Sequence, residues 1–308
     1  MASVSAVSVG LRMCRTSDDR LMSLPPPIVE KATRPATLLG DLGPRLLSAI
    51  AMIAAALASL YQGGFVFVVF WTVASVAVHW EWQRITGGPQ TQLRIMGGGL
   101  AVALAGGLMA VGQRDASLVV MTLTALIVFA FVPGPTRLWN AMGILYAGAL
   151  LLSVTVLRLS ILSGLESILW LFAIVWGTDI MAYFGGRLIG GPKLWPRVSP
   201  SKTWSGFLIG VGSGAIFGLL ALLALGGTVE PVPVIVLGLV TGAISQGGDL
   251  LESSIKRHYG VKDSSHLIPG HGGAMDRLDG FIAAAVFAAI FGTLHAGAAA
   301  AAHGLFVW

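Results

Sequence analysis

The chain has 308 residues, of which 55% are hydrophobic and only 11% are charged. Soluble domains carry about 25% charged residues, and a chain of this length cannot bury so much apolar surface in one core. A soluble globular protein is therefore excluded, and the high hydrophobicity excludes a disordered chain. The single cysteine excludes a disulfide framework and a site built from several thiolates. The composition predicts an integral membrane protein.

Residues 1–45 are the first segment that the sequence sets apart. They contain three consecutive prolines at 25–27 and little periodicity, and the first long apolar run starts only after them. A signal peptide would place its apolar run much closer to the N-terminus. We therefore predict a polar, poorly ordered cytoplasmic extension.

From residue 46 onward, long apolar runs alternate with short polar segments. A helix of about 20 apolar residues crosses a bilayer, and the many Gly and Ala residues suit close helix packing in lipid. We predict an all-α fold, a polytopic bundle of about nine membrane helices. The expected ranges are 46–60, 64–80, 96–111, 117–132, 138–157, 167–184, 206–225, 231–247 and 280–302.

The distribution of Lys and Arg predicts the orientation of this bundle. With the N-terminus in the cytoplasm, the cytoplasmic segments hold 17 of the 19 Lys and Arg residues, and the opposite side holds only Arg114 and Arg158. Cytoplasmic loops of membrane proteins are enriched in these cations, so we predict a cytoplasmic N-terminus. The cations form no stripe with interleaved aromatic residues, so nucleic acid is not expected as a partner.

The first long charged loop, 185–205, favours an anionic ligand. Residues 185–204 hold four cations, three hydroxyl side chains and no carboxylate. Such a segment suits phosphate, and residues 201–203 lie just before a helix, where free backbone N–H groups favour negative charge. The alternative is that these cations only touch lipid headgroups.

The second charged loop, 248–279, combines charges of both signs with a Gly-rich turn at 269–273. If the preceding helix continues through the loop, Asp249, Ser253 and Lys256 share one face. Carboxylates without a Cys cluster favour Mg²⁺ over zinc, so we expect Asp249 and Asp276 to hold a metal that bridges to phosphate oxygens. The alternative is that these residues are solvated charges and helix caps.

Ionisable residues also occur within the apolar runs. Asp179 lies inside one of them, where an ionisable side chain faces the bundle interior or a wet cavity by default. The alternative is a structural hydrogen bond to a neighbouring helix. His79 and Glu81 lie near a membrane boundary, and we expect them to be interfacial.

The stretch from 253 to 279 resembles the signature of the phosphatidate cytidylyltransferase (CDP-diacylglycerol synthase) family. The segments 179–183 and 199–204 also resemble motifs of that family, and the resemblance extends from about residue 177 to residue 280. Departures at Ser205, Ser265 and Ala274 affect details of substrate contact and leave the charged groups in place. The matching signature positions are Ser253, Lys256, Arg257, Lys262, Asp263, Pro269, His271, Gly272, Gly273, Asp276, Arg277 and Asp279.

The resemblance implies transfer of CMP from CTP to phosphatidic acid, which gives CDP-diacylglycerol and pyrophosphate in an early step of phospholipid synthesis. It implies Mg²⁺ as cofactor, as one ion or two, and a homodimer in the cytoplasmic membrane whose active site faces the cytoplasm. In this interpretation 46–165 are N-terminal membrane helices, and 166–308 form the catalytic membrane region with the cytoplasmic loops 185–205 and 248–279.

Site residues follow from the resemblance and the charge pattern as hypotheses. The expected metal ligands are Asp249, Asp276 and Asp279. The expected catalytic residues are Lys202, Lys256, Arg257, Asp276 and Arg277. The expected substrate-binding residues are Asp179, Ser201, Thr203, Ser253, His271, Gly272 and Gly273.

Two other classes of function remain open at this point. A related CTP-dependent lipid kinase, or a cytidylyltransferase for another lipid phosphate, would use the same kinds of residue. A polytopic transporter would also suit many membrane helices and an intramembrane carboxylate. Against a transporter, the sequence shows no convincing internal repeat, and its polar residues cluster at one face of the membrane.

Overall fold

The computed structural model describes residues 38–308, so most of the predicted extension 1–45 lies outside the described residues. Between Leu38 and the C-terminus, the chain forms nine α-helices and one small hairpin of two strands. The all-α fold predicted from the sequence is confirmed. The helices are α1 Leu38–Gln62, α2 Gly64–Thr86, α3 Thr91–Ala110, α4 Arg114–Phe131, α5 Arg137–Arg158, α6 Gly164–Ile189, α7 Trp204–Ala224, α8 Pro231–His258 and α9 Met275–Ala296.

Eight of these helices, α2 to α9, are long and apolar enough to cross a membrane. The apolar part of α1 in the described chain, Leu46–Gln62, is shorter. All nine predicted helices are therefore present, and α1 begins eight residues before the expected start at 46.

Several helix ends differ from the prediction by five residues or more, and the ends of α8 and α9 show why. α8 continues to His258, beyond the expected end at 247, because its last turns alternate buried with exposed residues and Lys256 pairs with Asp276 of α9. α9 ends at Ala296 instead of 302, because Gly297 has φ 80° and turns the chain back. The short 3₁₀ turns that follow, Ala298–Ala300 and His303–Leu305, pack onto the bundle and bury Leu305.

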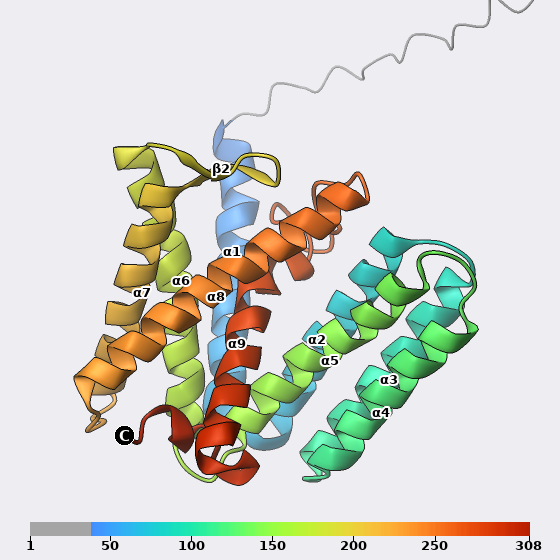
Figure 1. Ribbon diagram of the computed structural model, residues 1–308, viewed down its shortest axis with the longest axis horizontal. Helices are drawn as coiled ribbons and strands as arrows, with labels where there is room; N and C mark the ends of the chain where they lie inside the picture. Colours follow the sequence, from blue (N-terminus) through green and yellow to red (C-terminus); the bar gives the residue numbers. More distant parts are fainter. Residues whose placement is uncertain (1–37) are drawn as a thin grey trace, which may run out of the picture.

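The helices form two groups that meet along α5 and α9. In one group α2 packs on α3 and α5, and α4 packs on α3 and α5; in the other, α6, α7, α8 and α9 pack in sequence order. α1 lies next to α2 and α6, between the two groups (Figure 1). Both groups therefore contribute walls to the space beside α1.

A hairpin that the sequence did not predict connects α6 to α7. Its strands, β1 Lys193–Trp195 and β2 Ser199–Thr203, pair antiparallel, with Lys193 opposite Thr203. Thr203 also caps α7, because its hydroxyl accepts a hydrogen bond from the backbone N–H of Gly206. The hairpin thus fixes Lys202 directly above the first turn of α7.

Four glycines spaced four residues apart bring α7 against α6 with almost no space between the backbones. A Cβ at Gly206 would lie 2.6 Å from the carbonyl oxygen of Ala182, and one at Gly210 would lie 2.6 Å from that of Thr178. Closer to the other end, a Cβ at Gly218 would lie 2.8 Å from Ile174. Small residues at this spacing allow such close approach in lipid. The remaining glycine of the row is Gly214.

The two charged loops lie at the same end of the bundle, as the sequence predicted. Figure 1 shows the β1–β2 hairpin and the loop between α8 and α9 at the top of the bundle, together with the start of α1. A salt bridge between Lys202 and Asp249 joins the hairpin to α8 at this end. The side of the membrane that this end faces stays a prediction.

α8 and α9 cross where each contributes a glycine. A Cβ at Gly248 would lie 2.6 Å from the Cβ of Ala283 and 2.8 Å from the carbonyl oxygen of Asp279. Across the crossing, a Cβ at Gly280 would lie 2.7 Å from the Ser245 hydroxyl. The close crossing brings Asp249 on α8 and Asp279 on α9 together.

We expect Gly248→Val to lower both stability and activity. Overpacking of this kind costs about 1–3 kcal/mol, and it pushes apart the helices that carry Asp249 and Asp279. The matched control is Gly247→Val, because nothing lies within 4 Å of a Cβ at the neighbouring glycine. Thermal unfolding in detergent and turnover measure both variants. Equal unfolding temperatures for the two variants would contradict the importance of this crossing.

Candidate active site

A cavity of about 1360 Å³ opens at the end of the bundle that carries the two charged loops. One part of its lining is apolar and comes from helices, including Met52 and Ile53 of α1, Trp71 of α2, and Phe172 and Trp176 of α6. The other part is charged and polar. Its charged and polar residues are Asp179, Arg187, Lys193, Ser201, Lys202, Thr203, Gln246, Asp249, Lys256, Asp263, His271, Asp276, Arg277 and Asp279.

A chain of polar contacts connects the hairpin to α8 and α6. Lys202 Nζ lies 2.6 Å from Asp249 Oδ2 and donates to Gln246 Oε1 at 2.9 Å. The amide nitrogen of Gln246 in turn donates to Asp179 Oδ1 at 2.8 Å. Asp179 lines the cavity and also accepts this hydrogen bond from the neighbouring helix α8, which was the alternative expectation. Its part in substrate binding stays a prediction. The residue Gln246 is 3% exposed. It was not among the site residues predicted from the sequence.

Lys256 lies between two carboxylates on different helices. Its Nζ is 2.6 Å from Oε2 of Glu252, one turn earlier on α8, and 2.7 Å from Oδ1 of Asp276 on α9. The three side chains are 10%, 1% and 8% exposed, respectively. The ammonium group therefore compensates two carboxylates that are nearly removed from water.

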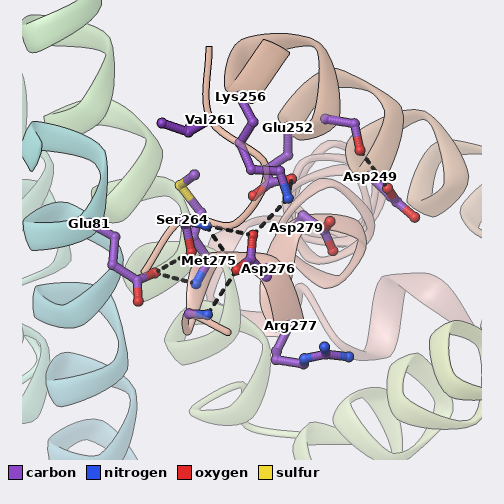
Figure 2. Close-up of polar contacts among 12 residues, drawn as sticks. Glu81, Asp249, Glu252, Lys256, Val261, Ser264, Met275, Asp276, Arg277 and Asp279 are labelled. Atoms are coloured by element: carbon purple, nitrogen blue, oxygen red, sulfur yellow. Dashed lines mark hydrogen bonds and ion pairs between the residues drawn. The ribbon is translucent and has the colours of Figure 1, made fainter. Parts of the chain in front are cut away.

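Asp276 also binds the backbone of the loop that precedes α9. Its carboxylate accepts hydrogen bonds from the backbone N–H of Ser264 at 3.0 and 3.1 Å and from that of Gly273 at 2.8 Å. Figure 2 shows Asp276 at the centre of these contacts, with Lys256 above it. The carboxylate thus orders both the loop and the lysine.

The Gly-rich turn 269–273 is fixed by contacts from both sides. Arg277 donates two hydrogen bonds, of 2.8 and 3.1 Å, to the carbonyl oxygen of His271. Ser48 on α1 lies 2.8 Å from His271 Nδ1 and donates to the carbonyl oxygen of Pro269. This turn therefore links α1 to the start of α9.

Glu81, in the helix group formed by α2 to α5, contacts the loop between α8 and α9. It lies on α2, is fully buried at 0% exposed, and accepts four hydrogen bonds from the segment 264–275. The expectation that His79 and Glu81 are interfacial is wrong, because both are 0% exposed. His79 packs against α3, where its ring lies 3.1 Å from the carbonyl oxygen of Arg94, and the loop between α8 and α9 covers Glu81 at the end of α2 (Figure 2). Because Glu81 directly follows the predicted membrane helix 64–80, no signal in the sequence indicated this burial.

Comparison with known proteins assigns this arrangement to a family. The sequence profile of the cytidylyltransferase family matches residues 44–295, which include α2 to α8, the hairpin, the α8–α9 loop and nearly all of α9. The chain belongs to the cytidylyltransferase family. The resemblance read from residues 177–280 is confirmed, and the match extends through the N-terminal helices as well.

Curated members of the family include close relatives of this chain. The phosphatidate cytidylyltransferase of Brucella abortus is 40% identical over 265 residues, which cover 84% of this chain and 96% of that protein. That of Brucella suis matches to the same extent. The phosphatidate cytidylyltransferase of Bacillus subtilis is 45% identical over 126 residues, which cover 39% of this chain and 44% of that protein.

The predicted site residues divide into two sets in this member of the family. Most of them line the cavity. Arg257 does not; it is exposed at the end of α8 and donates to the carbonyl oxygen of Val261. Ser253 lies behind Asp249, to which it donates at 3.2 Å. Gly272 and Gly273 also lie outside the lining. Both shape the turn, Gly272 with φ 84° and Gly273 because a Cβ there would overlap the Ser264 hydroxyl.

The carboxylates of the cavity are the oxygen donors that bear on Mg²⁺ binding. Asp179, Asp249 and Asp279 lie close enough to repel one another. Across residues 38–308, however, no group of three or more His, Cys, Asp or Glu is arranged so that it could hold a metal ion. Mg²⁺ is usually bound by one or two carboxylates plus substrate phosphates, so the oxygen donors fit this ion. The ligand assignment stays a prediction.

Proposed function

We propose that the protein transfers CMP from CTP to phosphatidic acid and so forms CDP-diacylglycerol and pyrophosphate. The observation that carries the proposal is a single cavity with a charged end and an apolar end between membrane helices. A lipid phosphate needs both environments, because its headgroup is anionic and its chains are apolar. The names of the curated relatives support the same reaction.

The chemistry needs no activated side-chain nucleophile. An oxygen of the lipid phosphate attacks the α-phosphorus of CTP, a new P–O bond forms there, and the bond to the β-phosphate oxygen breaks with its electron pair. A phosphomonoester has a second pKa near 6, about the value for phosphorylated side chains, so it is largely ionised at neutral pH. The protein must therefore align two anions and neutralise the charge that develops on pyrophosphate.

The cations of the cavity suit both tasks. Lys202 and Lys256 are held in place by carboxylates, and Arg277 is held by the carbonyl oxygen of His271. Side chains fixed in this way do not have to reorganise as charge develops. We assign to these three residues the binding of the triphosphate and the lipid phosphate. The hydrogen-bond donors Ser201 and His271 line the same cavity and support the assignment.

Mg²⁺ is proposed as the cofactor, held by Asp249 and Asp279, with Asp276 as a third predicted ligand. Bound there, the ion would supply positive charge to the phosphate oxygens. The contacts of Asp276 with Lys256 and two backbone N–H groups give that carboxylate a further role. It keeps the lysine and the loop in position beside the cavity.

The location and assembly of the enzyme are also proposals. The described helices make it a membrane protein, and the excess of Lys and Arg at the cavity end supports an active site facing the cytoplasm. We propose the cytoplasmic membrane as its location and a homodimer as its assembly state. Mass measurement of the intact protein released from detergent tests the dimer.

The function is tested with purified protein, CTP labelled at the α-phosphate, phosphatidic acid and Mg²⁺. We expect labelled CDP-diacylglycerol and one pyrophosphate per product. Diacylglycerol, which lacks the phosphate nucleophile, serves as the control and should yield no labelled lipid. A kinase would instead release CDP. Absence of a labelled lipid product with every lipid phosphate offered would defeat the proposal.

A further inference from the structure

Glu81 binds four hydrogen-bond donors that lie 183 to 194 residues later in the chain. Its Oε1 accepts from the Ser265 hydroxyl at 2.6 Å and from the backbone N–H of Ala274 at 2.8 Å. Its Oε2 accepts from the Ser264 hydroxyl at 3.1 Å and from the backbone N–H of Met275 at 2.6 Å. Both carboxylate oxygens are therefore used, and both by the α8–α9 loop.

Two of these donors belong to the start of α9. The first N–H groups of a helix have no partner within the helix, and Ala274 and Met275 carry two of them. Glu81 satisfies both, and its negative charge lies at the positive end of the helix dipole. Across residues 38–308 Glu81 forms no salt bridge. The backbone N–H groups at the start of α9 and the hydroxyls of the α8–α9 loop thus provide the partners of this buried carboxylate.

Glu81 and Asp276 hold the same loop from opposite sides. Ser264 donates its hydroxyl to Glu81 and its backbone N–H to Asp276. A Cβ on Gly273 would lie 2.5 Å from Glu81 Oε1, so the turn also packs directly on this carboxylate. Figure 2 shows Glu81 on one side of the loop and Lys256 on the other, with Ser264, Met275 and Asp276 between them.

We propose that Glu81 is a positioning residue for CMP transfer. It does not line the cavity. It fixes the loop and the first turn of α9, and through them Asp276, Arg277 and the Lys256 side chain bound to Asp276. The inference rests on the proposed function, and it gives α2, in the helix group farther from the hairpin, a direct part in building the site.

Glu81→Gln tests this role with almost no change of shape. One carboxylate oxygen becomes an NH₂ group, which cannot accept from the backbone N–H of Ala274 or Met275. A buried N–H without a partner is costly, so we expect kcat to fall by about 10- to 100-fold. The KM for CTP should change by less than about threefold, the pattern of an interaction used mainly in the transition state.

Hydrogen exchange locates the effect. In Glu81→Gln we expect faster exchange in the peptide 262–276 and unchanged exchange in α4 and α7. The control is Glu230→Gln, which changes an exposed carboxylate that makes no cap hydrogen bond at the start of α8. It should leave kcat, KM and exchange as in the unchanged protein. If Glu81→Gln does not fold, Ser265→Ala removes one of the four donors and should give a smaller change of the same kind.

Three outcomes would overturn the proposal: an unchanged kcat, an unchanged exchange rate in 262–276, or faster exchange throughout the bundle. The last would make Glu81 a residue of general stability. Failure of the proposed function looks different, because the unchanged protein would then form no CDP-lipid while the local exchange effect of Glu81→Gln persisted.

Discussion

Replacement of Lys256 with methionine is expected to lower the rate of CMP transfer by about 100- to 1,000-fold, the loss typical for a preorganised cation or donor at developing charge. It is also expected to lower stability by about 3–5 kcal/mol. The cause is the same contact, because Lys256 lies 2.6 Å from Glu252 and 2.7 Å from Asp276, both nearly buried. Without the ammonium group, the nearly buried Glu252 loses its ion-pair partner, and Asp276 keeps only its hydrogen bonds from the backbone N–H groups of Ser264 and Gly273.

A second substitution separates the two effects. Glu252 does not line the cavity, so Lys256→Met combined with Glu252→Gln should recover much of the lost stability and none of the activity. Thermal unfolding in detergent and pyrophosphate release measure the two quantities on the same samples. Recovery of activity in the double variant would mean that Lys256 serves only as a counterion.

Replacement of Asp249 with asparagine is expected to raise the Mg²⁺ concentration needed for half-maximal activity by roughly 10- to 100-fold, the range found when groups that support a metal site are removed. Asp249 lies at the crossing of α8 and α9, shares the cavity with Asp279, and pairs with Lys202 at 2.6 Å. The substitution leaves Lys202 without its partner, so the KM for CTP should change as well.

Glu230→Gln is the control for this prediction. It changes an exposed carboxylate outside the cavity to an amide, so its Mg²⁺ requirement should stay close to that of the unchanged protein. The two variants are compared by pyrophosphate release over a range of Mg²⁺ concentrations. An unaltered Mg²⁺ requirement in Asp249→Asn would remove Asp249 from the proposed metal ligands.

Much of the fold could be predicted because a bilayer permits few alternatives. A spanning segment must satisfy its backbone internally, so each long apolar run indicates a helix. The end of α8 was one exception, since apolarity stops at 247 while the helix continues to His258. A shared face for Asp249, Ser253 and Lys256 followed only if that continuation was assumed. The hairpin was missed because strands of three and five residues give no periodic signal.

Site residues could be predicted where a motif or charge pattern lies close to them in the sequence. They were missed where their partners are distant in the sequence. Charge asymmetry placed both loops together, but nothing near Glu81 or Gln246 in the sequence indicates partners 44 to 194 residues away. Arg257 is different, because adjacent residues on an α-helix point about 100° apart. Because Lys256 faces the cavity, the geometry of α8 points the Arg257 side chain away from it.

The row of glycines between α6 and α7 has a consequence for how a lipid substrate enters. Where the backbones of α6 and α7 are in direct contact, no side chains lie between them that could move aside to make room for a lipid. That wall of the cavity is rigid. We therefore expect the opening through which a phosphatidic acid leaves the surrounding lipid to lie on another wall, and the wall formed by α1, whose neighbours are α2 and α6, is our proposal for it.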